Sequence, residues 1–424
     1  MHPKKPPVYL LPVASSLHVE RVQPFIERAR KLLEQEGFRV EGPKEPVTDT
    51  KDLRITGQNG LLLVFLASGG SSEVAVAASW GRRALLWAYP SNNSLPSALS
   101  ARSKLRRAGA WRGEIIYGSL DSLPEEVLWE ARAITAQREL RNLRLGVLCD
   151  KRKWSSLLST YGELTGIFEM NIQHIGFSEL EQQIRQIDEE KAAEEAKTRL
   201  QGAMRENIEE SGAVAAFKLY LALRRIIDER GFSGVAVDCF WLIGRLGLTP
   251  CLALSLLLSE GLLGVCEADL ASAIAMKALA TFSEKPAWMA NLSQVDFKKA
   301  TLTLAHCTAP INLTKKAGGV RLTPHFESGL PLSLDVGLPR GLVTLTELQS
   351  RPARLIASLA VLEESSLKLA GTCRTQARVK LLGGAEALRR LLSLVGRHLV
   401  LAYGDHLQPL ERLCARLDIE FVRV

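Results

Sequence analysis

Apolar runs alternate with amphipathic segments along the first part of the chain. Residues 8–14 and 60–70 are nearly continuous apolar runs with the length of a buried strand, and 18–37 between them places its apolar residues at helical spacing. The segments 84–95 and 113–120 continue the alternation. Buried strands that alternate with amphipathic helices predict a parallel sheet with helices on its faces.

A second unit of the same kind begins at 144–154, where a new strand follows a long helix. Residues 231–240 predict another strand. Between them, the run 185–210 alternates both signs of charge at helical spacing and predicts a solvated helix. Residues 246–280 predict a helix, a turn and a second helix that begins at Cys266.

After residue 290 the chain changes to short β-like runs with frequent Gly and Pro, which predict a β-rich, barrel-like unit. A short helix and a strand close the chain. The β-like runs are ATLTLAHC, GGVRLTP, LPLSLDVG, GLVTLTEL, SLKLAGTC, RVKLLG and HLVLAYG.

The length of 424 residues exceeds what one hydrophobic core usually supports. We therefore predict an α/β fold class with two α/β parallel-sheet domains followed by a β-rich, barrel-like C-terminal domain. The expected boundaries are 1–141, 142–290 and 291–424. Hydrophobic residues make up 46% of the chain, which is enough to build packed cores and excludes a disordered or collagen-like class.

A net charge of +8 permits attraction to anions, and the segment 100–113 concentrates part of it in Arg102, Lys104, Arg106 and Arg107. These residues would suit an anionic sugar, although a solvated helix face explains them more simply. No RNP-type, zinc-finger or helix-turn-helix pattern occurs in the sequence, so we expect no nucleic-acid partner.

The seven cysteines are scattered and never in CxxC spacing, which argues against a disulfide framework and a zinc ribbon. A reducing, cytoplasmic location is expected. The apolar run at the N-terminus is short and broken by Pro12, which favours a first strand over a signal peptide. The longest apolar stretch, 251–266, is interrupted by Glu260 and two glycines, so no membrane span is predicted.

Candidate metal ligands lie at strand ends. His306 closes the run ATLTLAH, His398 opens HLVLAYG, and His325 lies in TPHFESG. A lone His is more often structural than a ligand, but three near strand ends favour a site. Cys307 follows His306 directly, and because adjacent strand residues point to opposite faces, the two are poorly placed to form a nucleophile and its base. We therefore expect His306 to be the functional residue of this pair.

Carboxylates and turn residues offer further candidates. Glu267 and Asp269 stand in what is predicted to be the first turn of a helix, where carboxylates often only cap the helix. The clusters 69–73 and 92–94 follow strands, where open α/β sheets bind ligands, although these residues also simply make turns. No GxSxG, Walker A or GxGxxG pattern is present, which leaves triad hydrolase, P-loop and dinucleotide functions without support.

Several segments together resemble the L-fucose isomerase and L-arabinose isomerase superfamily, and above all its shorter fucose-isomerase-like proteins. ASGGSSE and YPSNNSL resemble the N-terminal domain of that group, and RLGVLCDKRKW resembles its second domain. The likeness follows the order of the family along most of the chain. The remaining segments are PCLALSLLLSEGLLGVCEADL, WMANLSQVD, LTLAHCTAP, HFESG and GRHLVLAYGDHLQPLERLCARLDIEF.

The resemblance implies a divalent cation, typically manganese, between the second and third domains. On this pattern Glu267 is the first carboxylate ligand and a possible base, and His306 and His398 are histidine ligands. Asp269, two residues after Glu267, is our second candidate for a catalytic carboxylate. The implied activity is a metal-dependent aldose–ketose (ketol) isomerase acting through an enediol on a pentose, a deoxyhexose or a modified sugar. A cation that holds two adjacent sugar oxygens suits this chemistry, as do carboxylate and imidazole ligands.

The chain departs from the family at Asn291, which stands where a second carboxylate ligand is expected. An amide oxygen can bind a cation but cannot carry a proton at neutral pH. Either the alignment slips and Asp296 supplies the group, or Asp269 or a water replaces it, or the standard isomerisation does not run. The alternative function is therefore a non-catalytic sugar-binding or regulatory protein that lost the proton shuttle.

The family also implies a homo-oligomer, a trimer or hexamer, whose active sites border the N-terminal domain of a neighbour. Asn92, Asn93 and Ser94 are then expected to bind substrate in the pocket of another subunit. Trp154, in the segment that resembles the second domain, is expected to bind substrate as well. The expected partner is a small-molecule sugar.

Overall fold

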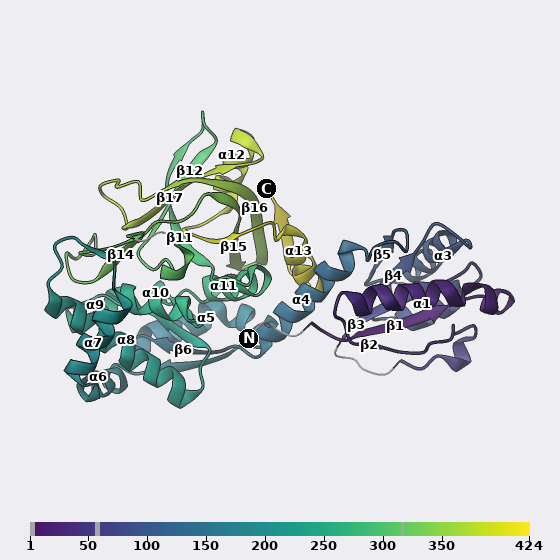
Figure 1. Ribbon diagram of the computed structural model, residues 1–424, viewed down its shortest axis with the longest axis horizontal. Helices are drawn as coiled ribbons and strands as arrows, with labels where there is room; N and C mark the ends of the chain where they lie inside the picture. The colour runs from purple at the N-terminus through teal and green to yellow at the C-terminus, as the bar shows by residue number, and fades with distance from the viewer. Residues whose placement is uncertain (1–4, 56–59, 315–317) are drawn as a thin grey trace. The chain divides into compact units, whose positions relative to one another are not determined.

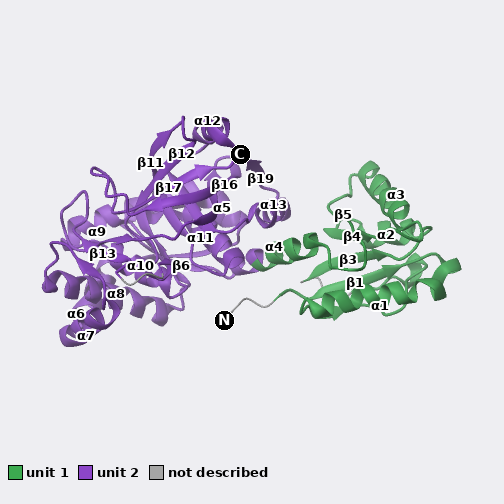
Figure 2. Cartoon of the chain, turned by 45° about the horizontal axis from the view of Figure 1, so that its top comes forward, with its two compact units in different colours: residues 1–135 green, residues 136–424 purple. Residues whose placement is uncertain are grey.

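The structure is a computed structural model that describes residues 5–55, 60–314 and 318–424. The chain forms two compact units, residues 1–135 and residues 136–424, which are coloured separately in Figure 2.

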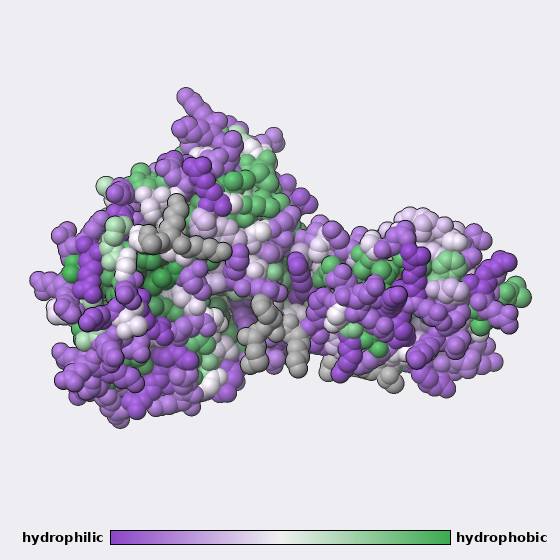
Figure 3. Space-filling view, viewed as in Figure 1, coloured by the Kyte–Doolittle hydropathy of each residue, from purple (hydrophilic) through white to green (hydrophobic). Residues whose placement is uncertain are grey.

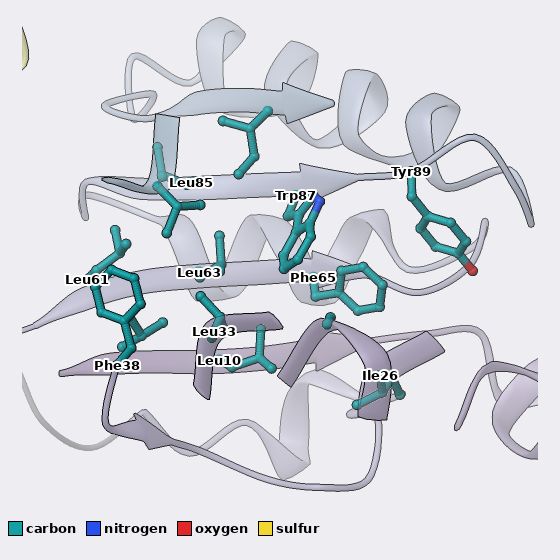
Figure 4. Packing of buried hydrophobic residues seen from close by; sticks show 14 of the residues in the cluster. Leu10, Ile26, Leu33, Phe38, Leu61, Leu63, Phe65, Leu85, Trp87 and Tyr89 are labelled. Carbon is teal, nitrogen blue, oxygen red and sulfur yellow. The ribbon is translucent and has the colours of Figure 1, made fainter. Parts of the chain in front are cut away.

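The first unit is a parallel five-stranded sheet in the order β2-β1-β3-β4-β5. Helices α1 and α4 pack on one face, and α2 and α3 on the other. Figure 4 shows Leu63, Phe65 and Trp87 of the sheet facing Ile26 and Leu33 of α1. The strands are β1 (Val8–Val13), β2 (Val40–Glu41), β3 (Leu61–Leu66), β4 (Ala84–Ala88) and β5 (Glu114–Tyr117), and the helices are α1 (Val19–Gln35), α2 (Ser72–Ser79), α3 (Ser94–Arg107) and α4 (Glu125–Arg141).

The second unit begins with a parallel four-stranded sheet in the order β10-β9-β6-β7. Strands β1, β3, β4 and β9 are buried along their whole length, which explains why their sequences are continuous apolar runs. The strands are β6 (Arg144–Leu148), β7 (Asn171–Ile175), β9 (Gly234–Val237) and β10 (Leu263–Val265), and the helices are α5 (Lys151–Ile167), α6 (Phe177–Gln186), α7 (Glu189–Arg199), α8 (Glu210–Arg230), α9 (Cys239–Leu246), α10 (Cys251–Ser259) and α11 (Leu270–Ser283).

Two expectations for this region are wrong in detail. The charged run 185–210 is not one helix: α6 ends at Gln186, Asp188 starts α7 by accepting a hydrogen bond from the Lys191 amide at 2.8 Å, and a short strand precedes α8. The segment expected to be a turn contains the buried strand β10, and α11 starts at Leu270 instead of Cys266. A three-residue strand is too short to show a periodic pattern.

A seven-stranded antiparallel-rich sheet forms the last part of the chain, in the order β15-β18-β11-β12-β17-β16-β19. Strands β15 and β16 also pair with each other, which closes six of the strands into a barrel and confirms the predicted fold class. Figure 1 shows the barrel strands beside α10 and α11. The strands are β11 (Trp288–Asp296), β12 (Thr301–His306), β15 (Gly341–Ser350), β16 (Ala353–Ser365), β17 (Thr375–Leu381), β18 (His398–Tyr403) and β19 (Glu420–Arg423), with helices α12 (Gly384–Leu394) and α13 (Leu407–Arg416).

Three details differ from the sequence expectation here. Strands β13 (Val320–Thr323) and β14 (Ser333–Val336) form a separate small sheet with β8 (Met204–Arg205) outside the barrel. The run SLKLAGTC is a loop, whereas the long strand β16 was not anticipated. The pairing of β13 with β8 joins segments far apart in the sequence, which no local pattern can indicate. The domain boundary at residue 290 remains a prediction.

The face shown in Figure 3 is mostly hydrophilic, with apolar patches over both units. Within residues 5–55, 60–314 and 318–424, no helix has both the length and the apolar composition needed to cross a membrane.

Candidate metal centre

Glu267 stands at the carboxyl end of β10, between that strand and α11. Its backbone has φ 56° and ψ 17°, and the next residue, Ala268, has φ 50°. Left-handed backbone at a residue other than glycine costs on the order of 1–3 kcal/mol and is concentrated at functional sites. The amide of Glu267 donates to the Cys239 sulfur at 3.4 Å, which helps to hold this turn. The turn points a largely buried carboxylate, 14% exposed, towards the barrel.

Two barrel strands bring histidines to this carboxylate. His306 ends β12 and His398 begins β18, and β11 lies between these strands. The Nε2 atoms of His306 and His398 lie 3.9 Å and 3.5 Å from Glu267 Oε1. One ligand atom from each of the three residues falls within 4.8 Å of the others. The structure thus brings together the three residues that the sequence proposed as carboxylate and histidine ligands.

The outer side of each imidazole is held by a hydrogen bond. His398 Nδ1 lies 2.7 Å from Asp269 Oδ2, and Asp269 in turn accepts bonds from the amide and hydroxyl of Ser272 at 3.0 Å and 2.9 Å. His306 Nδ1 lies 3.0 Å from the Thr308 hydroxyl. His398 Nε2 is buried and faces Glu267 Oε1 at ion-pair distance, without the geometry of a hydrogen bond to any residue that the structure describes. A ring held through Nδ1 with a free, inward-facing Nε2 is the arrangement of a metal-binding histidine.

Strong charges surround the cluster. Arg397 Nη1 lies 2.7 Å from Glu267 Oε2. Burial alone would raise the pKa of Glu267, but the nearby imidazoles of His306 and His398 and the charge of Arg397 outweigh it and lower that pKa well below its usual range. Burial lowers the pKa of His398, but Asp269 and Glu267 outweigh it and raise the pKa to about 9. A carboxylate that stays ionised beside two imidazoles fits a divalent cation such as Mn²⁺.

Asn291 lies on β11, where it pairs in register with His398 on one side and Ala305 on the other. Its role as a ligand stays a prediction. Asp296 is five residues further along the strand, roughly 17 Å away at about 3.4 Å per residue. It accepts hydrogen bonds from the amides of Lys298 and Lys299 at the turn. Asp296 is therefore too distant to replace the missing carboxylate, and that alternative is wrong.

Asp269 caps a helix, which is the simpler of the two expectations for it, and it also contacts a histidine. It caps α11 through Ser272, and the same carboxylate holds His398. These contacts indicate that Asp269 positions His398, and its catalytic role stays a prediction. The Tyr161 hydroxyl, from α5, lies 3.4 Å from the other oxygen of Asp269.

Sequence reasoning assigned no role to Asp238, which follows β9 at the same edge of the sheet. Burial raises its pKa, and the charge of Lys153 opposes this rise. Trp154, expected to bind substrate, stands on α5 beside Lys153 and packs against His174 with ring centroids 5.5 Å apart. A carboxylate directly after a strand is the signal that could have identified Asp238.

A cavity of about 300 Å³ opens beside His398 and Asp269. Its other polar walls include Tyr161, Arg351 and Arg397. The cavity is within the size range of small-molecule sites, and two guanidinium groups line it.

The remaining expected residues lie in the first unit. Ser94 is fully buried, where its hydroxyl donates to Leu66 O at 2.5 Å and accepts from the Tyr89 amide at 3.1 Å. Asn92 Nδ2 donates to the Tyr89 hydroxyl at 2.7 Å, and the Gly69 amide donates to Asn92 O at 2.6 Å. The two polar clusters of the sequence therefore meet at one edge of the sheet. The Ser94 hydroxyl is thus used in hydrogen bonds within the first unit, whereas the Asn93 side chain is exposed.

Comparisons with known proteins point to sugar isomerases. No profile of a known protein family matches the chain. It is 24% identical over 267 residues to a protein of Alkalicoccus urumqiensis named sulfoquinovose isomerase, covering 61% of this chain and 60% of that protein, which is less than two thirds of its length. It is also 24% identical over 318 residues to proteins of the same name from Priestia aryabhattai and Priestia megaterium, covering 72% of this chain and 70% of each.

Proposed function

We propose that this protein is an aldose–ketose isomerase that uses a divalent cation, with Mn²⁺ as the cation that suits its ligands best. The observation that carries the proposal is the convergence of Glu267, His306 and His398, with the buried His398 Nε2 facing Glu267 Oε1 at 3.5 Å. The similarity to proteins named sulfoquinovose isomerase supports the reaction class. Asn291, directly opposite His398 in the pairing of β11 with β18, is the proposed fourth ligand through its amide oxygen.

The reaction moves a proton between two neighbouring carbons of the sugar. A bound cation would polarise the carbonyl and hold the adjacent oxygen. Glu267, His306 and His398 provide the ligands, and Asp269 keeps the His398 ring in place. Arg397 lies beside Glu267 and the cavity, where its charge can hold anionic oxygen atoms of a sugar.

The proton transfer requires a general base that does not also bind the cation. The lowered pKa of Glu267 makes it a good ligand and a weak base. Asp238 directly follows β9, which packs against the turn that carries Glu267, and burial raises the pKa of Asp238. We therefore assign the proton transfer to Asp238, with Glu267 as the alternative that the sequence suggested.

The proposed substrate is a sugar that carries a sulfonate. Sulfoquinovose, the sugar in the names of the relatives, has this group, and a sulfonate requires a cationic partner in its site. Arg351 and Arg397 line the cavity beside His398 and supply two guanidinium groups. Subunit association, with Asn93 reaching a neighbouring site, is part of the same proposal.

The test is ketose formation by the manganese-loaded full chain, with sulfoquinovose and glucose as paired substrates. We expect turnover of sulfoquinovose in preference to glucose. Asp238→Asn is expected to lower kcat by about 10²-fold or more, because it removes the proton acceptor and keeps the shape. The matched control is Asp188→Asn, which makes the same change at the exposed N-cap of α7 and should leave kcat unchanged. Full activity of Asp238→Asn would contradict the assignment of Asp238 and would favour Glu267 as the group that transfers the proton.

A non-catalytic sugar-binding protein is the second candidate, and Asn291 is the observation that favours it. In that case sulfoquinovose would bind the manganese-loaded chain without forming a ketose. Calorimetric binding without turnover for every sugar tested would select this candidate over the isomerase.

A further inference from the structure

A second cluster of metal-binding side chains lies outside the centre described above. Cys251, Cys307 and His325 each place one ligand atom within 4.8 Å of the other two. All three are buried, with exposed fractions of 2%, 2% and 7%. Cys251 is the first residue of α10, Cys307 follows β12 directly, and His325 follows β13. The cluster therefore joins three elements that are distant in sequence.

The two clusters are attached to the end of the same strand. His306 faces Glu267, while its neighbour Cys307 faces Cys251. Adjacent residues of an extended chain point in opposite directions, so one strand end can serve two sites. The chemistry of the two differs as well. A carboxylate with two imidazoles suits Mn²⁺, whereas thiolates with an imidazole suit Zn²⁺.

A third thiol, from Cys373, borders the cluster at Cys307 and lies outside the group of atoms within 4.8 Å of one another. The Cys373 thiol is in hydrogen-bonding contact with the Cys307 thiol, and Cys373 is only half-buried, which leaves a way in from solvent. The Arg374 amide donates to the Cys307 sulfur at 3.5 Å. In the tautomer that binds an ion through Nε2, His325 Nδ1 carries the proton and donates it to the Ser328 hydroxyl, 3.0 Å away. The Ser328 amide, which donates to the same nitrogen at 3.3 Å when that nitrogen is unprotonated, loses this bond.

We propose that Cys251, Cys307 and His325 hold a structural zinc ion, with Cys373 as its fourth ligand. Binding would release the thiol protons to solvent and tie α10 to the end of β12. The ion would thereby fix the strand end that carries His306. This site is independent of the proposed isomerase activity, because it shares no ligand with the centre at Glu267. The alternative is that these thiols pack as small apolar groups, as buried cysteines often do.

Cobalt(II) is the probe, because bonds from thiolate sulfur to cobalt absorb in the near ultraviolet and bonds from carboxylate or imidazole do not. Cobalt is added to the metal-free full chain of His398→Ala, which removes a ligand of the first centre and no ligand of the second. We expect the thiolate absorption to appear at one cobalt per chain and to disappear when Zn²⁺ is added. Failure of saturating cobalt to produce this absorption, in this variant and in the wild type, would overturn the proposal.

Variants then locate the ion. Cys251→Ser should lose the thiolate absorption. His325→Gln is the second variant, for use where Cys251→Ser folds poorly, and it should weaken cobalt binding. The matched control is Cys266→Ser. This variant also removes a buried thiol, one that lies 2.8 Å from the Cys239 sulfur and belongs to neither group of candidate metal ligands. Retention of the absorption in Cys251→Ser and its loss in Cys266→Ser would place the ion elsewhere and contradict the assignment.

Discussion

Gly264, in the middle of β10, offers a sharp test of the packing that positions Glu267. A Cβ atom added at residue 264 would lie 2.3 Å from the backbone oxygen of Leu254 and 2.9 Å from its carbonyl carbon and Cα. Leu254 belongs to α10, and the clash is with its backbone, so no rotamer change can relieve it. Gly264→Ala must therefore push α10 away from β10 or displace the strand that leads to Glu267.

The expected cost can be bounded from this geometry. Adding a methyl group to a well-packed core usually costs about 1–3 kcal/mol when side chains can adjust. Here the neighbour is backbone, which cannot adjust, so we expect Gly264→Ala to lower the free energy of unfolding by at least about 3 kcal/mol. At roughly 2–4 °C per kcal/mol for a large domain, the Tm of the second unit should fall by about 6–12 °C.

Gly162→Ala is the matched control, since it adds the same methyl group in the same unit. Gly162 is exposed in α5 and an added Cβ would meet no atom within 4 Å. Alanine is a better helix former by about 1 kcal/mol, so this variant should be as stable as the wild type or more stable. Thermal unfolding followed by circular dichroism measures both. Equal Tm values for the two variants would refute the described contact of β10 with α10.

Three further predictions concern the sites and the fold. Asp269→Asn keeps the cap of α11 but should bring the pKa of His398 down from about 9 towards 6.5, measured by NMR titration of the metal-free protein. Because the raised pKa stabilises the fold below about pH 6.5 and this contribution is lost as pH rises through about 9, the same variant should flatten the decline of stability over that window. Ser94→Ala should cost about 1–3 kcal/mol in chemical denaturation, because it leaves the Leu66 carbonyl and Tyr89 amide without their shared buried partner. Arg321→Ala should cost about 3 kcal/mol in the same assay, because Asp335, 2% exposed, loses its guanidinium partner.

The sequence predicts the main architecture because buried parallel strands and amphipathic helices leave strong local patterns. Strand ends at His306 and His398 are also visible, since the apolar runs stop or start there. What the sequence cannot show is β10, which spans three residues, and the left-handed turn at Glu267 that follows it. A helix start was expected there because the acidic residues resemble a first turn.

The arrangement of the sites depends on tertiary contacts that local patterns do not encode. The bond between Asp269 and His398 joins residues 129 positions apart. The cluster of Cys251, Cys307 and His325 has no recognisable spacing, so the scattered cysteines argued against a zinc ribbon and gave no sign of this group. Asp238 was visible at the end of a strand, but its proximity to the turn of Glu267 follows only from the order of strands in the sheet.

The most direct test of the central claim is isomerisation in D₂O by the metal-free chain, before and after Mn²⁺ is added, with sulfoquinovose as substrate. NMR spectra recorded after removal of protein and metal report both the ketose and the deuterium that enters from solvent at the carbon next to the carbonyl. We predict manganese-dependent ketose formation with deuterium uptake in the wild type, and neither in His398→Ala. Ketose formation that is equal with and without Mn²⁺, or that survives in His398→Ala, would contradict the metal centre proposed here.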